Sequence, residues 1–545
     1  MSAHSDVLSG GASESAVDFD ALIVGAGFAG IRTLYELRQI GLTARVLETG
    51  SDVGGTWYWN RYPGARTDSE AWVYAFCFSK DLLNEWSWSE RYPSQPEVER
   101  YLRHVVDKFD LRKDMQFNTH VASAVFDEST DTWVVTSDSG ATYRTQYLIT
   151  GLGHSSHPYR PPFPGLDGFS GEWYQSARWP KEEVDFRGKR VALVGTGATG
   201  VQLVPAIADQ AEHLTVFQRT PNWVLPARNH TLDEETWAEI RADYDAIWQK
   251  VFSQNFALPY DSAHRVASDV TPREQQDILE RGYRIGHFQF LFETFDDVLV
   301  DEKTNELVCE FLRGKIRQTV KDPATAELLC PRYPLLAKRP PLGTLYYESF
   351  NRDNVTLVDV SEKPLEDVVP DGLRTADAEY PVDVIVFATG FDAVTGSYHT
   401  LDIVGRDGAH LMDTWKDGPR TNLGAMVDGF PNLFMVDGPH VPFANIPAVV
   451  DRSVRWIGRT LTEMRDKAHT VIEPTPDAVE KWTNLMSELL QGTLLAKGAS
   501  VHAWFLGGNI PGKPIVAMNY HGGANNYFAT LDEEIDADYP GFTRR

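Results

Sequence analysis

Cysteine is nearly absent from this chain, which has three cysteines among 545 residues. Cys77, Cys309 and Cys330 lack the paired spacing of a zinc site or of a disulfide-rich secreted domain. We therefore expect no metal site and no disulfide framework. So few cysteines are typical of a reducing compartment, and the cytoplasm is the expected location.

Long apolar runs and an excess of positive charge are missing as well. No run reaches the roughly 18 apolar residues of a transmembrane helix. Residues 1–16 lack the charged start and apolar centre of a signal peptide, and we expect them to form a disordered tail. The formal net charge of −26 disfavours nucleic acid and anionic membranes as partners, because their phosphates would repel the protein.

Two stretches of the form GxGxxG, residues 25–30 and 195–200, are the strongest features present. Each follows a short apolar run and precedes a plausible helix. In that context the first glycine makes a tight turn, the second lets backbone approach a pyrophosphate, and the third lets the helix pack on the strand. One such motif is weak evidence, because glycine is common. Two of them predict an α/β chain with two Rossmann-like dinucleotide-binding domains, the alternative being chance glycine turns.

The two units differ where their second strands end. Residues 44–47 run into Glu48, at the place where a carboxylate can accept hydrogen bonds from a ribose. Residues 215–218 run instead into Arg219 and Thr220, and a guanidinium there can bind a 2′-phosphate. This difference predicts FAD or NAD in the first unit and NADP in the second, and hence electron transfer from NADPH to FAD. The alternative is that both residues are ordinary solvated side chains.

The rest of the chain is divided between these units and a helical insertion. We expect the first parts of the FAD and NADP domains in residues 17–153 and 154–221, and an inserted helical lid in 222–334, with helices near 233–253, 271–284 and 303–319. Residues 335–390 would complete the NADP domain. Residues 391–545 would complete the FAD domain and add a C-terminal active-site segment. Strands are expected at 133–136, 143–145 and 147–150, and four prolines mark a linker: Pro158, Pro161, Pro162 and Pro164.

Together these motifs resemble the flavin-dependent Baeyer–Villiger monooxygenases, in the cyclohexanone monooxygenase-like group, over residues 17–540. Residues 169–180 match the family fingerprint FxGxxxHxxxW, followed by proline, except that Gln175 replaces the histidine. The aromatic-rich residues 54–68, which by themselves predict either a loop on a planar ligand or a core plug, match the long motif from GGxW to PGxxxD. Residues 338–340, 351–355 and 388–396 match as well.

The resemblance implies a reaction. NADPH reduces FAD, the reduced flavin and O2 give a C4a-peroxyflavin, and this attacks a ketone to form an ester or lactone, with cyclic ketones as the expected substrates. Arg339 would be the fixed positive charge that stabilises the peroxide anion and the oxyanion of the adduct, and Asp68 would hold Arg339 in place. An ordinary interdomain ion pair is the alternative for these two residues.

Further cofactor contacts are expected. Lys338 would join Arg219 around the 2′-phosphate, and Trp504 would contact the NADP ribose near the flavin; a solvated basic face and a core tryptophan are the alternatives. The expected cofactor-binding residues are Gly25, Gly27, Phe28, Gly30, Glu48, Gly55, Thr56, Trp57, Asp68, Tyr74, Gly195, Gly197, Ala198, Thr199, Gly200, Arg219, Thr220, Lys338 and Trp504.

Gln175 is the one departure from the fingerprint. The family histidine lies in a linker and couples domain movement. Glutamine keeps hydrogen-bonding capacity but cannot become a cation near neutral pH. We expect activity to survive, without a pH-linked coupling at this position.

The sequence does not name the ketone. Phe288, Phe290 and Phe443 are expected to line the substrate pocket, or alternatively to pack in the core. The expected partners are a small-molecule ketone and O2, and the chain is expected to be a monomer or a weak homo-oligomer. Competing functions are a heteroatom monooxygenase, a redox-sensing flavoprotein without catalysis, and a disulfide reductase. The last is disfavoured because Cys77 has no second cysteine in its own segment.

Overall fold

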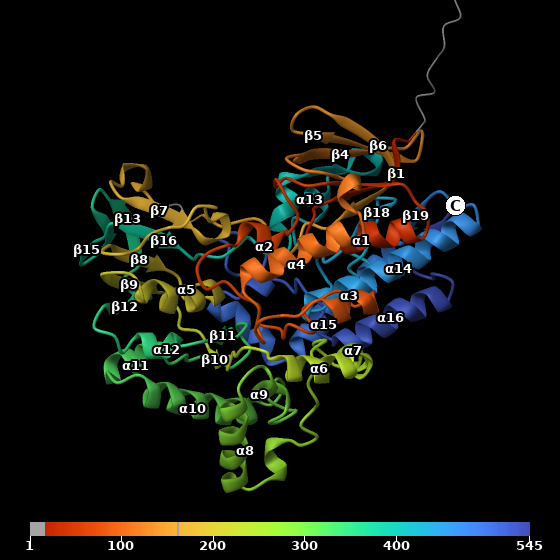
Figure 1. Cartoon of the computed structure of the whole chain (residues 1–545). Helices are drawn as coiled ribbons and strands as arrows, with labels where there is room; N and C mark the ends of the chain where they lie inside the picture. The colour runs from red at the N-terminus through yellow and green to blue at the C-terminus, as the bar shows by residue number, and fades with distance from the viewer. Residues whose placement is uncertain (1–16, 161–162) are drawn as a thin grey trace, which may run out of the picture.

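The structure is a computed structural model that describes residues 17–160 and 163–545. The expected N-terminal tail lies outside the described residues. Two sheets with parallel cores lie on opposite sides of the molecule, with a group of helices below them in Figure 1. The predicted α/β fold with two Rossmann-like units is confirmed.

The first sheet contains the first glycine motif and has the strand order β17-β4-β5-β6-β1-β2-β3, with β18 also paired to β6. Its strands are β1 (Phe19–Val24), β2 (Ala44–Leu47), β3 (Met115–Gln116), β4 (Val121–Asp127), β5 (Thr132–Ser137), β6 (Thr142–Thr150), β17 (Asp402–Val404) and β18 (Leu433–Met435). Because β17 and β18 come from the last third of the chain, this sheet is completed only when that segment folds back onto it.

One strand replaces two that the sequence predicted. β6 is continuous over nine residues, whereas strands were expected at 143–145 and 147–150. Its start pairs with β5 and its end with β1, and Thr145 faces both Trp133 and Phe19. No glycine or proline interrupts this stretch, so a single strand serves the hairpin and the parallel sheet.

The second sheet contains the second glycine motif and has five strands in the order β12-β9-β8-β16-β7. They are β7 (Glu172–Gln175), β8 (Arg190–Val194), β9 (His213–Gln218), β12 (Val355–Asp359) and β16 (Val384–Phe387), and all neighbours are parallel. Gln175, expected in a linker, is the last residue of the edge strand β7 and pairs with Phe387. The expectation of a linker at this residue was therefore wrong.

Helices cover both sheets and fill the insertion. Those that share hydrophobic clusters with the first sheet are α1 (Phe28–Gln39), α2 (Thr56–Trp59), α3 (Lys80–Glu85), α4 (Gln95–Lys108), α13 (Leu411–Thr414), α14 (Ile446–Asp466), α15 (Pro476–Gln491) and α16 (Ala524–Asp536). Those beside the second sheet are α5 (Ala198–Ala208) and α12 (Tyr346–Ser349). The insertion contains α6 (Glu234–Ala242), α7 (Tyr244–Ser253), α8 (Pro272–Ile285), α9 (Gln289–Phe292), α10 (Glu302–Thr319) and α11 (Pro323–Leu329). The helix expected over 233–253 is interrupted at Asp243.

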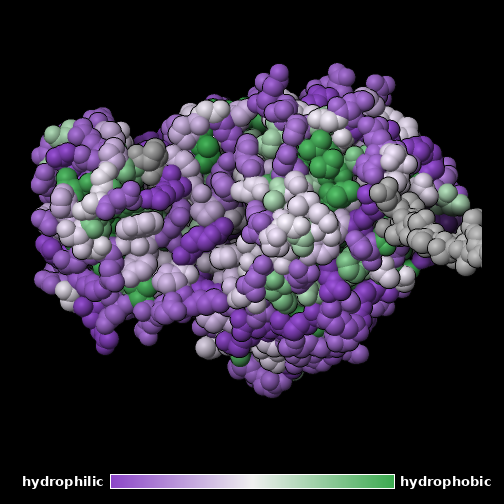
Figure 2. Space-filling model, turned by 90° about the horizontal axis from the view of Figure 1, so that it is seen from above, coloured by the Kyte–Doolittle hydropathy of each residue, from purple (hydrophilic) through white to green (hydrophobic). Residues whose placement is uncertain are grey.

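Small antiparallel or two-stranded pieces complete the chain. They are β10 (Leu225–Pro226) with β11 (Leu342–Gly343), the meander β13 (Leu365–Val369), β14 (Gly372–Thr375) and β15 (Glu379–Pro381), and β19 (Ile472–Pro474) with β20 (Phe542–Arg544). Among the described residues, no helix has the length and apolar character needed to cross a membrane. The face shown in Figure 2 is mostly hydrophilic, as the large negative charge leads one to expect.

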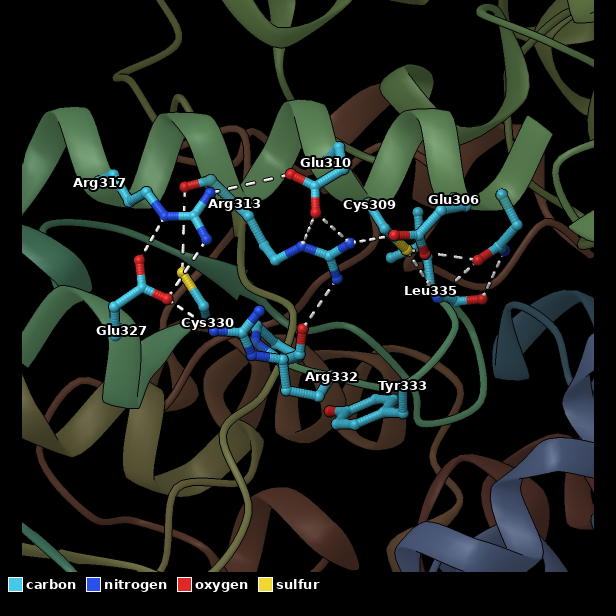
Figure 3. A network of polar contacts seen from close by, with 12 residues as sticks. Glu306, Cys309, Glu310, Arg313, Arg317, Glu327, Cys330, Arg332, Tyr333 and Leu335 are labelled. Atoms are coloured by element: carbon cyan, nitrogen blue, oxygen red, sulfur yellow. Dashed lines mark hydrogen bonds and ion pairs between the residues drawn. The ribbon is translucent and has the colours of Figure 1, made fainter. Parts of the chain in front are cut away.

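Helix α10 fixes the segment that leads back from the insertion into the second unit (Figure 3). Arg313 is 4% exposed, forms ion pairs with Glu306 and Glu310, and donates from Nη1 to the carbonyl of Pro331 at 3.1 Å. Asn305 both donates to and accepts from the backbone of Leu335, at 3.0 Å each way. Residues 331–335 are therefore held against the helix, a few residues before Lys338 and Arg339.

Candidate active site

A cavity of about 1020 Å³ lies between the two sheets. Its wall includes both glycine motifs, most of the loop 54–69, the pair Lys338 and Arg339, and residues from 437–450 and 502–509. Segments that are hundreds of residues apart in the sequence therefore meet around one space. Of the expected cofactor-binding residues, all but Gly30 and Gly200 line it.

Gly30 and Gly200 act through packing instead. A β-carbon on Gly30 would stand 1.8 Å from the carbonyl oxygen of Gly25, and one on Gly200 would stand 2.2 Å from that of Gly195. Gly25 and Gly195 take φ values of +101° and +112°, a region that favours glycine. These turns let α1 and α5 start directly behind the strands, with their N-termini toward the cavity, where a phosphate is favoured.

Gly30→Ala should lower both the free energy of unfolding and the binding of the dinucleotide. The added methyl group collides with backbone that cannot move without shifting the turn, and overpacking of this kind costs about 1–3 kcal/mol or more. Gly314→Ala is the matched control, because that helical position in α10 has open space, and it should gain about 0.5–1 kcal/mol. Thermal unfolding and bound flavin per chain would be measured. A Gly30→Ala protein with unchanged melting temperature and flavin content would contradict the packing argument.

Glu48 is fixed at the end of β2. Its Oε2 accepts from the backbone N–H of Ala26 at 2.7 Å and its Oε1 accepts from that of Gly50 at 2.6 Å. Burial raises the pKa of Glu48, and these two hydrogen bonds oppose the rise. Each carboxylate oxygen keeps a second lone pair, so the side chain can still accept from ribose hydroxyls in the cavity.

Arg339 and Asp68 form an ion pair on the cavity wall. Arg339 Nη2 donates to Asp68 Oδ2 at 2.6 Å, and Asp68 is buried while the Arg339 side chain is 32% exposed. Burial raises the pKa of Asp68, and Arg339 opposes this rise. The loop that ends in Asp68 belongs to the first unit and Arg339 follows the insertion, so the pair joins the two units at the cavity.

Lys338 and Arg219 form a positive cluster at the wall made by the second unit. Both line the cavity, and the described residues provide neither of them with a carboxylate partner. Burial, and then the charge of Arg219, lower the pKa of Lys338 to about 8. Two cations left without a counter-ion make a site that favours a polyanion such as a phosphate.

Aromatic side chains form much of the remaining wall. Trp57 Nε1 donates to the hydroxyl of Tyr74 at 3.1 Å, and burial raises the pKa of Tyr74. On the C-terminal side, the rings of Trp504 and Phe443 lie 5.6 Å apart, and both line the cavity. These planar groups are suited to contact a planar ligand.

Two of the three expected substrate residues lie elsewhere. Phe290 is 1% exposed inside the core of the insertion, and Phe288 packs against the same cluster. Neither is among the described residues that line the cavity, so the expectation that they contact substrate is corrected. Phe290 packs against Tyr283 of α8 and Phe311 of α10, so the apolar core of the insertion accounts for its burial.

Several other wall residues were not predicted from the sequence. Arg178 stacks over Trp59, with its guanidinium 4.5 Å from the ring centroid, and both line the cavity. His154 and Asp437 lie on the wall next to each other, 3.5 Å apart. The signal that could have found Asp437 is the short apolar run 433–436, which contains β18 and is followed directly by this acid.

Gln175 holds one of the segments that cross between the sheets. Its Nε2 donates to the carbonyl of Tyr159 at 3.1 Å, and Thr389 Oγ1 donates to the same oxygen at 2.8 Å. Tyr159 in turn donates its backbone N–H to Gly390 at 3.0 Å. Gln175 therefore holds one crossing segment at the edge of the second sheet. It is not among the described residues that line the cavity.

Gln175→His should change turnover by less than about tenfold and leave the flavin content unchanged, because a ring N–H can donate to the same carbonyl and the residue is remote from the reacting groups. Gln175→Ala, which removes the donor, should slow turnover more. Flavin absorbance per chain and steady-state NADPH oxidation would be measured. Loss of flavin in the histidine variant would show that this residue supports the first unit and not the crossing segment.

Comparison with known proteins gives consistent results. A family model described as pyridine nucleotide-disulphide oxidoreductase matches residues 22–276. The chain is 42% identical to a Baeyer-Villiger monooxygenase of Pseudooceanicola batsensis, over 97% of this chain and 96% of the relative. It is also 42% identical to the phenazine N-monooxygenase of Lysobacter antibioticus, over 96% of each chain. The closed crystal structure of cyclohexanone monooxygenase superposes with a TM-score of 0.94 at 41% identity, covering 97% of this chain and 99% of that one, and other similar structures are complexes with FAD and NADP.

The cysteines do not supply the dithiol that the description of the family model suggests. All three are free; Cys77 is partly buried, and Cys309 and Cys330 are buried in the insertion. Burial raises the pKa of Cys309 to about 12 and also raises that of Cys77, so neither is a ready thiolate. The match therefore reflects the shared dinucleotide-binding architecture and not disulfide chemistry.

Proposed function

The chain belongs to the Baeyer–Villiger monooxygenases, and from this premise we propose that Arg339, held by Asp68, supplies the positive charge at the reacting centre. The protein is an NADPH- and FAD-dependent ketone monooxygenase that inserts one oxygen atom of O2 next to a carbonyl to give an ester or lactone, with cyclic ketones as its substrates. The observation that carries the residue assignment is the Arg339–Asp68 pair on the wall of a cavity that both glycine motifs share.

The residues present fit both cofactors. The turn at Gly25, the start of α1 and the carboxylate of Glu48 would hold the pyrophosphate and ribose of FAD. The turn at Gly195 would hold the pyrophosphate of NADPH, with Arg219, Thr220 and Lys338 around its 2′-phosphate. FAD, when bound and reduced by NADPH, would supply the activation of O2, which is the source of the inserted oxygen atom.

The chain's own groups then have distinct tasks. Arg339 remains charged when partly buried and would stabilise negative charge that develops on oxygen beside the flavin. Asp68 fixes the orientation of that guanidinium through a charge-assisted hydrogen bond. Trp57, Tyr74, Phe443 and Trp504 would keep water away from the reacting centre, which strengthens the electrostatic effect.

We also propose the domain division predicted from the sequence, with residues 17–153 and 391–545 in the FAD domain and 154–221 and 335–390 in the NADP domain. The second sheet takes its strands from 172–218 and 355–387, and the first takes strands from 19–150 and 402–435, which supports this division. Residues 222–334 would act as the lid. A monomer or weak homo-oligomer in the cytoplasm is proposed, in keeping with three unpaired cysteines.

Product analysis tests the ketone assignment against oxygenation of nitrogen, the second candidate that the phenazine relative suggests. Purified enzyme with NADPH and O2 would be given cyclic, linear and aryl ketones and, separately, an aromatic N-heterocycle. We expect ester or lactone in proportion to NADPH consumed. N-oxide from the heterocycle without ester from any ketone would replace the proposed reaction.

A further inference from the structure

Asp437 places a carboxylate on the cavity wall, and one of its oxygens has no hydrogen-bond partner in the part of the chain that the structure describes. The residue follows β18 and is 7% exposed, and its Oδ1 is buried without a partner among the described residues. The nearest side-chain nitrogen is that of His154, whose Nε2 lies 3.5 Å from Oδ1 and 3.1 Å from the carbonyl oxygen of Gly438. Burial raises the pKa of Asp437, and His154 opposes the rise.

An acceptor in this state is costly to the protein. Buried polar groups are nearly always hydrogen-bonded, and a carboxylate loses more than a neutral group when it leaves water. His154 compensates only in part, because 3.5 Å is too long for a good hydrogen bond and its Nε2 is already close to Gly438. A buried acceptor that the fold leaves open, and that borders a cavity, is therefore explained by a donor on the molecule that the cavity binds.

The position of Asp437 points to the reacting end of the cavity. Asp437 lines the same cavity as Tyr74 and as the pair of Arg339 and Asp68. Beyond Asp437 the wall is largely apolar, with Pro442, Phe443, Ala444, Ile446, Val450 and Trp504. Asp437 and His154, with Asn445 as a further polar residue on this stretch of wall, have the form of orienting groups in a small-molecule site.

We propose that Asp437 and His154 form a polar subsite that accepts a hydrogen bond from a hydroxyl group of the ketone substrate and so sets substrate preference. The donor is a neutral group. An anionic substituent would be repelled by Asp437, and a cationic one would add to the charges of Arg339, Lys338 and Arg219 in the same cavity. The inference rests on the proposed function, because it takes a ketone as the ligand.

The test compares two ketones that differ only in the group that would reach the subsite. 4-Hydroxycyclohexanone and 4-methylcyclohexanone have similar size, and the ratio of their kcat/KM values measures recognition of the hydroxyl. In the FAD-loaded enzyme, Asp437→Leu should lower that ratio about ten- to a hundredfold, as expected when a hydrogen bond to a charged acceptor is lost. Asp437→Asn keeps an uncharged acceptor oxygen and should lower it less. His154→Leu, which alters only the second member of the pair, should also lower it.

His157→Leu is the matched control. His157 is a second cavity histidine, but the carboxylate whose charge acts on it is that of Asp392, so the hydroxyl-to-methyl ratio should stay at the wild-type value. Flavin absorbance per chain is measured for every variant. If Asp437→Leu fails to fold, the Asn and His154 variants decide the question.

Two results would overturn the proposal. The first is an unchanged ratio in flavin-loaded Asp437→Asn and His154→Leu. The second is an Asp437 variant that loses flavin while the fraction of enzyme that keeps FAD shows an unchanged hydroxyl-to-methyl ratio. That result would assign the carboxylate to a ribityl hydroxyl of FAD. Failure of the proposed function looks different, because wild-type enzyme would then form no lactone from either ketone.

Discussion

Arg339→Ala should fold, bind FAD and oxidise NADPH, but release hydrogen peroxide in place of ester or lactone. Hydride transfer to the flavin does not need this charge in its own transition state. Oxygen insertion does, because negative charge develops on oxygen in a water-poor cavity. Loss of one such preorganised donor typically lowers a rate about 10²- to 10³-fold, so product per NADPH should fall to a few per cent or less.

Conservative and control variants sharpen this expectation. Arg339→Lys should rescue little, because an ammonium cannot reproduce the forked guanidinium that Asp68 orients at 2.6 Å. Arg332→Ala is the matched control: this arginine is 64% exposed and pairs with Glu327 in the same segment (Figure 3), so product per NADPH should stay at the wild-type value. Ester or lactone, peroxide and NADPH would be measured in one reaction. A wild-type ratio in Arg339→Ala would remove the residue from the mechanism.

The features that could be predicted from the sequence depend on short stretches. A glycine turn is specified by its own residues and its flanking strand, so β1, β2 and the turns at Gly25 and Gly195 were located correctly. The same local logic placed Glu48 and Arg219 at strand ends, and both lie on the cavity wall. The Arg339–Asp68 contact required the family resemblance, since 271 residues separate the two.

The features that were missed depend on distant partners. Strand β7 has an exposed tryptophan, Trp173, and no alternation of buried and exposed residues, so only its pairing with β16 makes it a strand. Phe290 and Phe443 are the same residue type, yet one packs in the insertion and the other lines the cavity. That difference is set by which helices surround them, and no local pattern in the sequence reports it.

Arg219→Ala and Lys338→Ala should each lower the enzyme's preference for NADPH over NADH. Both cations lie on the cavity wall without a carboxylate partner among the described residues, and the 2′-phosphate is the group that distinguishes the two nucleotides. A charge-assisted hydrogen bond is worth about 1.5–3 kcal/mol, so the KM for NADPH should rise roughly ten- to a hundredfold, while that for NADH changes little. Lys497→Ala, at an exposed lysine paired with Glu302, should leave both constants unchanged. An equal rise of the KM values for NADPH and NADH would contradict the assignment of these two residues to the 2′-phosphate.

The preference for NADPH should also depend on pH, and Lys338 sets the direction. Burial and Arg219 lower the pKa of Lys338 to about 8, so the free enzyme carries this charge below pH 8 and loses it above. A phosphate monoester with a second pKa near 6 is a dianion throughout this range, so the change belongs to the protein. Binding the 2′-phosphate above pH 8 requires Lys338 to take up a proton. The affinity for NADPH therefore falls by up to tenfold per pH unit, while the affinity for NADH is unaffected. The KM for NADPH divided by the KM for NADH, measured from pH 7 to pH 9.5, should therefore rise with pH in wild-type enzyme. In Lys338→Ala this ratio should not change with pH. A flat ratio in wild-type enzyme would mean that Lys338 does not contact the 2′-phosphate.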